Sequence, residues 1–466
     1  MNNTIPPSCD SISNSSAFRV PVRLRRTSCL DSIAVRRSHL TVVLIALLLF
    51  PSAIAHCRSA TAKRTLILVS LDGFRWDYLN RGVTPNMGAL ASTGVKAQSM
   101  IPVFPSETFP NHYSIVTGVY PEKHGIVRNS MYDPEFEATF SMSKNAADSR
   151  WWGAEPIWVT VEKQGQNSAT FFWPGSEAEI EGTRPEYWKK YDRTVADSKR
   201  VEEVLAWLDL PAEKRPSFIA LYFSDTDQAG HAHGPDSPQV RDAIKSLDHE
   251  IGSLVEGLKT RNLLDSTDII IVSDHGMAAT NERQRIFLPD YVSRSLLQDD
   301  LSSGGACGLI WPVAGKEAEV YKALLKAPHI KVFRKEEVPS YFHYRNNRRI
   351  APVVLVADEG WEIATERAPG GPGGSMASGR RGLADDLFRT TGEHGYDPRI
   401  LSMRAIFIAA GPDFRQGTVI EPFENIQLYN LMCRILGLKA APNDGNTTWS
   451  DTVLRPVAAG ATASYK

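Results

Sequence analysis

Aspartates and histidines stand at the ends of apolar runs in the 466-residue chain. The runs are TLILVSLDG, FIALYFSDTDQAGH and DIIIVSDHG, at residues 65–73, 218–231 and 268–276, and GEHGYD at residues 392–397 supplies another histidine. Carboxylates and imidazoles are ligands for divalent metals such as zinc. The pattern therefore indicates a metal site that is assembled from distant parts of the chain.

Two sets of ligands can be drawn from these ends: Asp72, Asp274 and His275 for one cation, and Asp227, His231 and His394 for a second. Mixed carboxylate and imidazole ligation suits zinc, and three protein ligands leave a position open for chemistry. Two metals about 3.5 to 4 Å apart can clamp the attacking and leaving oxygens of a phosphoryl group. Any one of these residues alone could be a turn, cap or core residue, but all six in strand-end or glycine-flanked positions favour a pair of metals.

The attacking group is expected in residues 101–125, where Ser106 and Thr108 lie in a proline-bounded turn before a predicted helix at residues 111–117. A hydroxyl is a poor nucleophile at neutral pH unless a metal or a base activates it. A bond from the Thr108 oxygen to a cation would provide that activation. Asn111 could donate its amide N–H to a phosphoryl oxygen. The competing interpretation is that this turn is only a helix N-cap.

Strand-like runs alternate with amphipathic helical segments along most of the chain. The clearest helix is predicted at residues 238–261, where apolar side chains recur at helical spacing. This alternation predicts an α/β fold with a mainly parallel sheet sandwiched by helices. In such folds, ligands bind beyond the carboxyl ends of the strands, which is where the aspartates and histidines are placed.

The rhythm of strands and helices breaks after residue 285, which predicts an inserted cap subdomain. Residues 369–382, PGGPGGSMASGRRG, are a flexible loop by composition. The predicted organisation is a leader at 1–57, a catalytic domain at 63–285 and 385–445, an insertion at 286–384 and a tail at 446–466.

The leader has the features of an export signal. Several arginines precede an apolar run at residues 40–55 that ends in the small-residue pattern Ala53-Ile54-Ala55. The alternatives are a cleaved signal peptide and a signal anchor that holds the chain in a membrane. Either predicts an exported protein that is secreted, periplasmic or on the outer face of a membrane.

Composition bounds the class of protein. A hydrophobic content of 42% and a charged content of 23% support a large folded core. The 52 basic and 53 acidic residues nearly cancel, so no net charge draws the chain to a nucleic-acid backbone. We therefore expect a small-molecule phosphodiester as partner rather than a specific nucleic-acid sequence.

Seven separated segments resemble, in order, motifs of the nucleotide pyrophosphatase/phosphodiesterase family of the alkaline phosphatase superfamily. They are VSLDGFRWDYL, PVFPSETFPNHYSIVTGVYPEKHGIVRN, FFWPGSE, DTDQAGHAHGP, VSDHGM, GEHGYDPRILSMRAIFIAAGPDF and FENIQLYNLMCRILGLKAAPNDG. The resemblance implies an alkaline-phosphatase-like fold and two Zn²⁺ per chain. It implies one zinc on Asp227, His231 and His394, and the other on Asp72, Thr108, Asp274 and His275. Thr108 would form a phosphoryl-threonine intermediate, and Asn111 would stabilise the oxyanion.

The resemblance also implies a substrate slot, in which Phe109 and Tyr222 would sandwich a nucleobase. The expected reaction is hydrolysis of nucleoside triphosphates to monophosphate and pyrophosphate, and of dinucleotides and nucleotide esters. Two alternatives on the same scaffold stay open, a lipid head-group (choline-type) phosphodiesterase and a phosphonate hydrolase. A sulfatase is disfavoured, because residues 106–110, SETFP, lack the C/S-x-P-x-R pattern of those enzymes.

Overall fold

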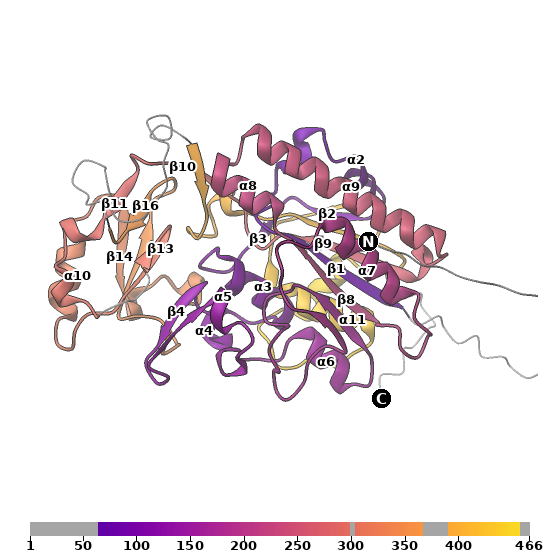
Figure 1. Ribbon diagram of the computed structural model, residues 1–466, viewed down its shortest axis with the longest axis horizontal. Coiled ribbons are helices and arrows are strands. Elements are labelled where there is room, and N and C mark those ends of the chain that lie inside the picture. The colour runs from indigo at the N-terminus through magenta and orange to yellow at the C-terminus, as the bar shows by residue number, and fades with distance from the viewer. Residues whose placement is uncertain (1–63, 299–302, 367–389, 457–466) are drawn as a thin grey trace, which may run out of the picture. The chain divides into compact units, whose positions relative to one another are not determined.

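The computed structural model describes residues 64–298, 303–366 and 390–456. The chain divides into two units, Met1–Ala60 and Thr61–Lys466, and all described residues belong to the second (Figure 1). The predicted leader and the glycine-rich loop lie outside the described residues. Among the residues that are described, no helix is both long enough and apolar enough to cross a bilayer.

An eight-stranded sheet forms the centre of the second unit. Its strand order is β19 (Thr418–Ile420), β2 (Val95–Ala97), β18 (Phe407–Ala410), β9 (Thr267–Val272), β1 (Thr65–Leu71), β8 (Phe218–Phe223), β6 (Ser168–Phe171) and β7 (Tyr187–Lys189). Neighbouring strands run parallel except at β18, which is antiparallel to β9 and β2. The predicted mainly parallel α/β sheet is confirmed, with one reversed strand near an edge.

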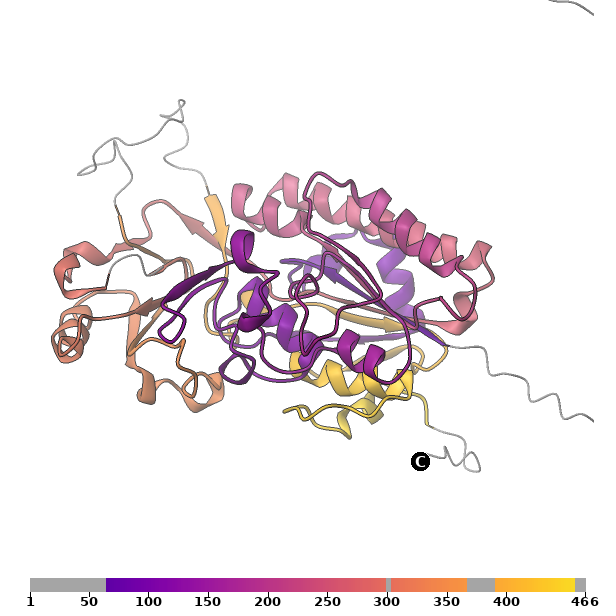
Figure 2. The same cartoon turned by 60° about the horizontal axis from the view of Figure 1, so that its bottom comes forward.

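Helices cover both faces of this sheet, because its strands are apolar on both sides. Ile67 and Val69 of β1 pack in a cluster with α2 (Pro85–Thr93), α7 (Asp197–Leu208) and α9 (Pro238–Thr260). Leu66 and Leu68 point the other way and pack in a cluster with α3 (Thr108–Thr117), α6 (Ile157–Lys163) and α11 (Leu428–Leu436). Figures 1 and 2 show α9 and α11 on opposite sides of the sheet.

The helix predicted at residues 238–261 is confirmed as α9, Pro238–Thr260. Ser237 begins it by accepting a hydrogen bond from the Val240 N–H at 3.3 Å, and Pro238 occupies the first turn. Further helices and strands are α4 (Pro121–His124), α5 (Met142–Asn145), α8 (Asp225–His233), β3 (Met100–Ile101), β4 (Ser130–Asp133), β5 (Ala138–Ser141), β10 (Ala278–Asn281), β11 (Arg285–Phe287), β16 (Glu362–Ala364), β17 (Thr390–Glu393) and β20 (Phe423–Glu424).

A second, smaller sheet lies in the region where the sequence pattern breaks. Its four antiparallel strands are β12 (Ser303–Gly304), β13 (Cys307–Ile310), β15 (Val353–Ala357) and β14 (Ile330–Arg334). Helix α10 (Glu317–Leu324) contributes Val320 and Leu324 to a core of its own with Val353 and Leu355. This sheet lies within the predicted insertion at 286–384, and that assignment stays a prediction.

Three parallel strands bring the predicted ligands to one edge of the main sheet. Residue Ser70 of β1 pairs with Tyr222 of β8 and with Val272 of β9. The chain therefore leaves these strands at the same level, and Asp72, Asp274 and Asp227 follow one, two and four residues after the strand ends.

Candidate metal centre and nucleophile

The first ligand set comes from helix α8 and the residue after β17. Asp227 and His231 lie one turn apart on α8, so both side chains point to the same side. The Asp227 Oδ1 is 3.4 Å from the His231 Nε2 and 3.5 Å from the His394 Nε2, and the two Nε2 atoms are 3.1 Å apart. Three ligand atoms therefore converge on one point.

The second ligand set follows β1 and β9. The His275 Nε2 is 3.5 Å from the Asp72 Oδ1 and 3.0 Å from the Asp274 Oδ2. Gly73 allows the two sets to approach, because its φ is +66° and a Cβ there would lie 2.9 Å from the Asp227 Cα. The rings of His275 and His394, one from each set, stack with centroids 3.6 Å apart.

These distances fit metal ligation. Ligand atoms at the corners of a tetrahedron with bonds of about 2.0 Å lie roughly 3.3 Å apart. The converging carboxylate oxygens, Asp72 Oδ1, Asp227 Oδ1 and Asp274 Oδ2, are buried and accept no hydrogen bond. The Asp274 Oδ2 also lies 3.3 Å from the His112 Nδ1. An unpaired buried carboxylate oxygen is costly, and a divalent cation would satisfy it. Each set is thus a candidate metal site.

The histidines are oriented from behind. The Nδ1 of His394 lies 2.8 Å from the Ser106 carbonyl, that of His231 lies 2.9 Å from the Gly392 carbonyl, and that of His275 lies 2.9 Å from the Gly276 carbonyl. A ring whose Nδ1–H donates to a carbonyl presents an unprotonated Nε2, which is the form that binds a metal. All three Nε2 atoms face the candidate sites.

The electrostatics of the cluster show a surplus of negative charge. Burial raises the pKa of Asp72 well above its ordinary value, and the charges of Asp274 and Asp227 add to this. Burial opposes protonation of His275, but pairing with Asp274 outweighs it and raises the pKa of His275 to about 9. Cations bound between these carboxylates would relieve their repulsion and compete with the proton for the imidazole.

Thr108 is the first residue of α3 and faces the second set. Its Oγ1 lies 3.4 Å from the His275 Nε2. The other predicted hydroxyl is engaged elsewhere, because the Ser106 Oγ donates to the Tyr396 carbonyl at 2.7 Å and Ser106 is fully buried. The structure thus brings Thr108, and not the Ser106 hydroxyl, beside the candidate metal ligands.

A pocket of about 470 Å³ adjoins the first ligand set. Its lining combines catalytic-domain and insertion residues: Glu107, Arg128, Asn129, Ser130, His231, Gly304, Gly305, Ala306, Thr365, Glu393 and His394. The insertion thus forms part of the wall beside the metal ligands, and a substrate group can reach them from this side.

Residues 66–397 match the model of a protein family described as "Type I phosphodiesterase / nucleotide pyrophosphatase". The match covers more than half of the chain and includes every predicted ligand. The chain belongs to this family. It is therefore an enzyme of the nucleotide pyrophosphatase/phosphodiesterase family, within the alkaline phosphatase superfamily.

Similar proteins span fungi, snakes and mammals. A pyrophosphatase/phosphodiesterase of Schizosaccharomyces pombe, described as uncharacterized, is 40% identical over 403 residues, covering 82% of this chain and 78% of its own length. Venom phosphodiesterase of Naja atra is 40% identical over 407 residues, covering 84% of this chain and 47% of its own length. This chain therefore spans about half the length of the venom enzyme.

A solved structure shows the same fold. Murine ectonucleotide pyrophosphatase/phosphodiesterase 5 superposes with a TM-score of 0.76 at 35% identity, and the match covers 84% of this chain and 100% of the murine one. The human protein of the same name also gives a TM-score of 0.76 at 35% identity.

The contacts of Asn111 in this phosphodiesterase do not favour the role predicted for it, which stays untested. The Asn111 side chain is fully buried, and its amide nitrogen donates to the carbonyls of Pro105 at 2.9 Å and Glu107 at 2.8 Å. Its oxygen accepts from the Val103 N–H at 2.7 Å. Side chains of a helix point toward its N-terminus, so Asn111 braces the preceding turn.

Asn129, which the sequence analysis did not single out, is better placed. It lines the pocket beside His231 and His394, and its Oδ1 accepts the Phe109 N–H at 2.8 Å. That bond turns the amide oxygen toward α3 and leaves the amide nitrogen as a candidate donor to a phosphoryl group. The signal available in the sequence was its position at the end of the segment PVFPSETFPNHYSIVTGVYPEKHGIVRN.

Tyr222 has a different environment from the one predicted. It is 7% exposed, and its hydroxyl donates to the Asp72 Oδ2 at 2.5 Å. Its hydroxyl therefore orients a candidate metal ligand, whereas Phe109 is half-buried beside Thr108. The exposed aromatic ring nearby is Tyr191, which is 44% exposed and has its ring centroid 6.3 Å from that of Tyr222.

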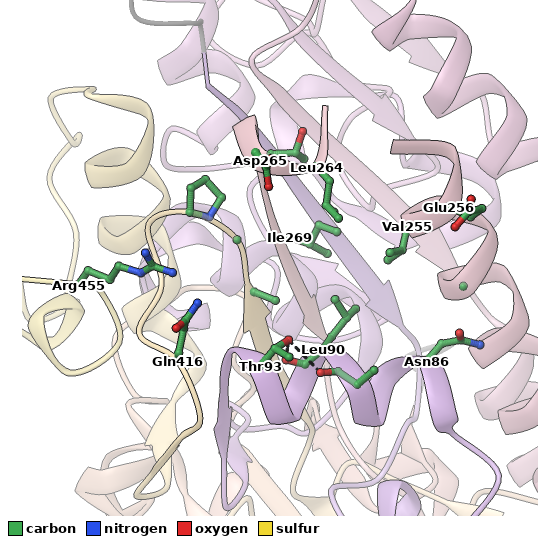
Figure 3. A pocket seen from close by; sticks show the side chains of 16 residues that line it. Asn86, Leu90, Thr93, Val255, Glu256, Leu264, Asp265, Ile269, Gln416 and Arg455 are labelled. Atoms are coloured by element: carbon green, nitrogen blue, oxygen red, sulfur yellow. Dashed lines mark hydrogen bonds between the residues drawn. The ribbon is translucent and has the colours of Figure 1, made fainter. Parts of the chain in front are cut away.

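A larger pocket, of about 610 Å³, lies at the opposite edge of the sheet (Figure 3). It is bordered by Thr267 at the start of β9, by Ala410 at the end of β18 and by residues of α2 and α9. The ligand sets lie at the other end of β9. Size alone would therefore select the wrong pocket as the catalytic site.

Proposed function

We propose that this protein is a zinc-dependent hydrolase of nucleotide phosphodiester and pyrophosphate bonds that acts through a phosphoryl-threonine intermediate on Thr108. The observation that supports this most strongly is the position of the Thr108 hydroxyl, 3.4 Å from the His275 Nε2, beside two ligand sets whose three inward carboxylate oxygens accept no hydrogen bond.

Zinc would be held by Asp227, His231 and His394 in one site, and by Asp72, Asp274, His275 and the Thr108 oxygen in the other. Two zinc ions bound there would supply Lewis-acid stabilisation to the attacking and leaving oxygens of the phosphoryl group. The donor set supports zinc because it combines imidazole nitrogens with carboxylate oxygens.

The chain's own groups position the phosphoryl group. Thr108 begins a ten-residue helix, whose N-terminal N–H groups and dipole favour an anion. In the first step, the Thr108 oxygen forms a bond to phosphorus while the bond to the leaving oxygen breaks. In the second step, water attacks phosphorus and the threonine oxygen leaves. The Asn129 amide nitrogen would donate to a phosphoryl oxygen as charge develops in each step.

A nucleotide substrate is supported by a relative and by exposed aromatic rings. A murine structure is described as the inactive threonine-to-alanine variant of ectonucleotide pyrophosphatase/phosphodiesterase 5 in complex with AMP. In this chain, the half-buried ring of Phe109 and the exposed ring of Tyr191 could stack on a base. The names of relatives, which include venom and ectonucleotide enzymes, support export of this protein.

The test compares Thr108→Ala with the parent protein on p-nitrophenyl thymidine monophosphate and p-nitrophenyl phosphorylcholine. We expect the parent to prefer the nucleotide ester, and Thr108→Ala to lose at least about 1000-fold in kcat/KM, because the covalent step is removed. Ser106→Ala serves as the matched hydroxyl control and should keep activity within about tenfold, since its hydroxyl does not face the ligands.

Near-normal turnover by Thr108→Ala would overturn the proposed mechanism. A parent protein that prefers the choline ester would instead favour the lipid head-group alternative. Mass spectrometry of protein quenched during turnover should detect a phosphoryl adduct on the peptide that contains Thr108.

A further inference from the structure

Glu107, the residue before the proposed nucleophile, is placed unusually for its position. It is the N-cap of α3, yet its side chain makes no capping bond to that helix. The carboxylate is 6% exposed and points toward the loop that carries Arg128. A buried negative charge beside the nucleophile would repel an anionic phosphate, so the position of this carboxylate requires an explanation.

Both oxygens of this carboxylate are held. The Oε1 accepts from the Arg128 Nε at 2.8 Å and lies 2.6 Å from the second guanidinium nitrogen of the same arginine. The Oε2 accepts from the Asn129 N–H at 2.8 Å. Glu107 therefore fixes the backbone of Asn129 as well as the neighbouring arginine.

The side chain of Asn129 in turn contacts the first turn of α3. Its Oδ1 accepts the Phe109 N–H, at 2.8 Å. The helix that carries Thr108 is thus capped by a side chain from another loop, which in turn is held by the residue before Thr108. Arg128 extends the chain of contacts to the insertion, because its guanidinium donates to the Gly304 carbonyl at 3.1 Å.

Stability alone does not account for this arrangement. A buried ion pair contributes little net stability compared with well-packed apolar residues, because both charges lose their hydration. The charge-assisted hydrogen bond from the Arg128 Nε and the close contact of its second nitrogen do fix the geometry of the Glu107 carboxylate. Here the contacts fix the start of α3, which carries Thr108, and Asn129, which lines the pocket beside His231 and His394.

We propose that the Glu107–Arg128 ion pair is a positioning pair, which sets the orientation of Thr108 and Asn129 and anchors them to the insertion. The inference rests on the proposed function, since it concerns the nucleophile named there. Neither charged group needs to contact the substrate. The pair acts by holding the Asn129 amide and the first turn of α3 in one arrangement.

The kinetic test uses Glu107→Gln, Arg128→Met, Arg128→Lys and the double variant Glu107→Gln/Arg128→Met, with p-nitrophenyl thymidine monophosphate as substrate. We expect Glu107→Gln and Arg128→Met each to lower kcat by about 10- to 100-fold with KM changed less than about threefold, because misplacement of reacting groups costs this much. Arg128→Lys keeps the charge and should recover part of kcat. The double variant should lose little more than either single one.

The second readout is hydrogen–deuterium exchange, which does not depend on turnover. Glu107→Gln should speed exchange in peptides that contain the Phe109 and Asn129 amides, while zinc content and melting temperature change little. Arg261→Met is the matched control, because it removes a two-bond ion pair with Asp209 at an exposed site. It should leave both kcat and these peptides unchanged.

Two results separate this inference from the proposed function. If Thr108→Ala is inactive but the pair variants keep kcat within twofold and normal exchange, the positioning role is wrong and the nucleophile stands. A loss that appears only as lower melting temperature or lower zinc content, with kcat per zinc-loaded site unchanged, would also reject the positioning role. An active Thr108→Ala would instead remove the proposed function.

Discussion

A buried aspartate lies near each end of strand β9, and the two aspartates differ in their surroundings. Asp268 is the second residue of the strand, and Asp274 lies two residues after its last residue, Val272. Both side chains are fully buried, and each has one oxygen, the Oδ2, without a hydrogen-bond partner. Their surroundings decide which of them belongs to a site for chemistry.

Asp274 lies beside other carboxylates that also have an oxygen without a hydrogen-bond partner. Its Oδ2 is 3.0 Å from the His275 Nε2, and buried oxygens of Asp72 and Asp227 also lack hydrogen bonds nearby. Asp268 is isolated: its Oδ1 accepts from the Asp413 N–H at 3.1 Å, and its Oδ2 lies 3.8 Å from Arg64. Convergence of unpaired ligand atoms, rather than burial or pocket size, therefore marks the catalytic edge.

The largest expected effect is that of removing a ligand at one end of the strand. Asp274→Asn should lower kcat/KM for a nucleotide phenyl ester by at least about 100-fold and release zinc, because even groups that only orient ligands affect activity by 10- to 100-fold. Asp268→Asn makes the same chemical change at the other end and should keep kcat/KM within about twofold. Equal losses of kcat/KM in the two variants would show that Asp274 has no special role in catalysis.

Removal of metal should abolish activity, because the candidate metal ligands lie together beyond the carboxyl ends of the strands. A strong chelator should abolish hydrolysis, and added zinc should restore it, because the inward carboxylate oxygens accept no hydrogen bond and the proposed reaction depends on bound metal. The chelated protein should also melt at a lower temperature, since bound metal stabilises the folded state. Full activity after complete removal of metal, checked by elemental analysis, would reject the candidate centre.

The ligands could be predicted from the sequence because strand ends carry their own signal. An apolar run that stops at an aspartate indicates both a buried strand and the end of that strand, and parallel strands bring those ends together. Asp72 and Asp274 follow this rule directly. The direction of β18 carried no such signal, because an apolar run reads the same whether its strand is parallel or antiparallel.

The roles of Asn111, Asn129 and Tyr222 show where sequence reasoning stops. Asn111 was selected because it is near Thr108 in the chain, but helix geometry turns its amide back onto Pro105 and Glu107. Asn129 reaches α3 from a loop held by Glu107, a contact that no local periodicity encodes. Tyr222 lies on a strand buried on both faces, so its ring is enclosed and only its hydroxyl reaches the site.

A smaller effect is expected when the group behind Asp72 is changed. Tyr222→Phe removes the hydroxyl that donates to the Asp72 Oδ2 but keeps the ring. We expect a 10- to 100-fold weaker affinity for zinc, as for other groups that orient metal ligands. Zinc titration followed by activity measures it. If the ring instead stacked on a base, this variant would bind zinc normally, and Tyr222→Leu would mainly raise KM.

The smallest effect is expected at Asp268, which lies far from the candidate metal ligands. It is a change in the pH dependence of the free energy of unfolding. Burial raises the pKa of Asp268 to about 7, although the charges of Arg64 and Arg455 oppose this. The folded state then holds a proton that the unfolded chain releases near pH 4. This contribution to stability is present below about pH 4 and is lost as pH rises toward 7.

Asparagine does not titrate, so the stability of Asp268→Asn relative to the parent protein should increase as pH rises. Between pH 5.5 and 8, we expect the difference in free energy of unfolding to shift in favour of Asp268→Asn by on the order of 1 to 2 kcal/mol. Paired thermal melts measure the shift, because titrations common to both proteins cancel. Asp265→Asn replaces an exposed aspartate three residues earlier and should show no such trend. A constant difference for Asp268→Asn across this range would mean that Arg64 keeps Asp268 ionised, and that both ends of the strand hold carboxylates charged at neutral pH.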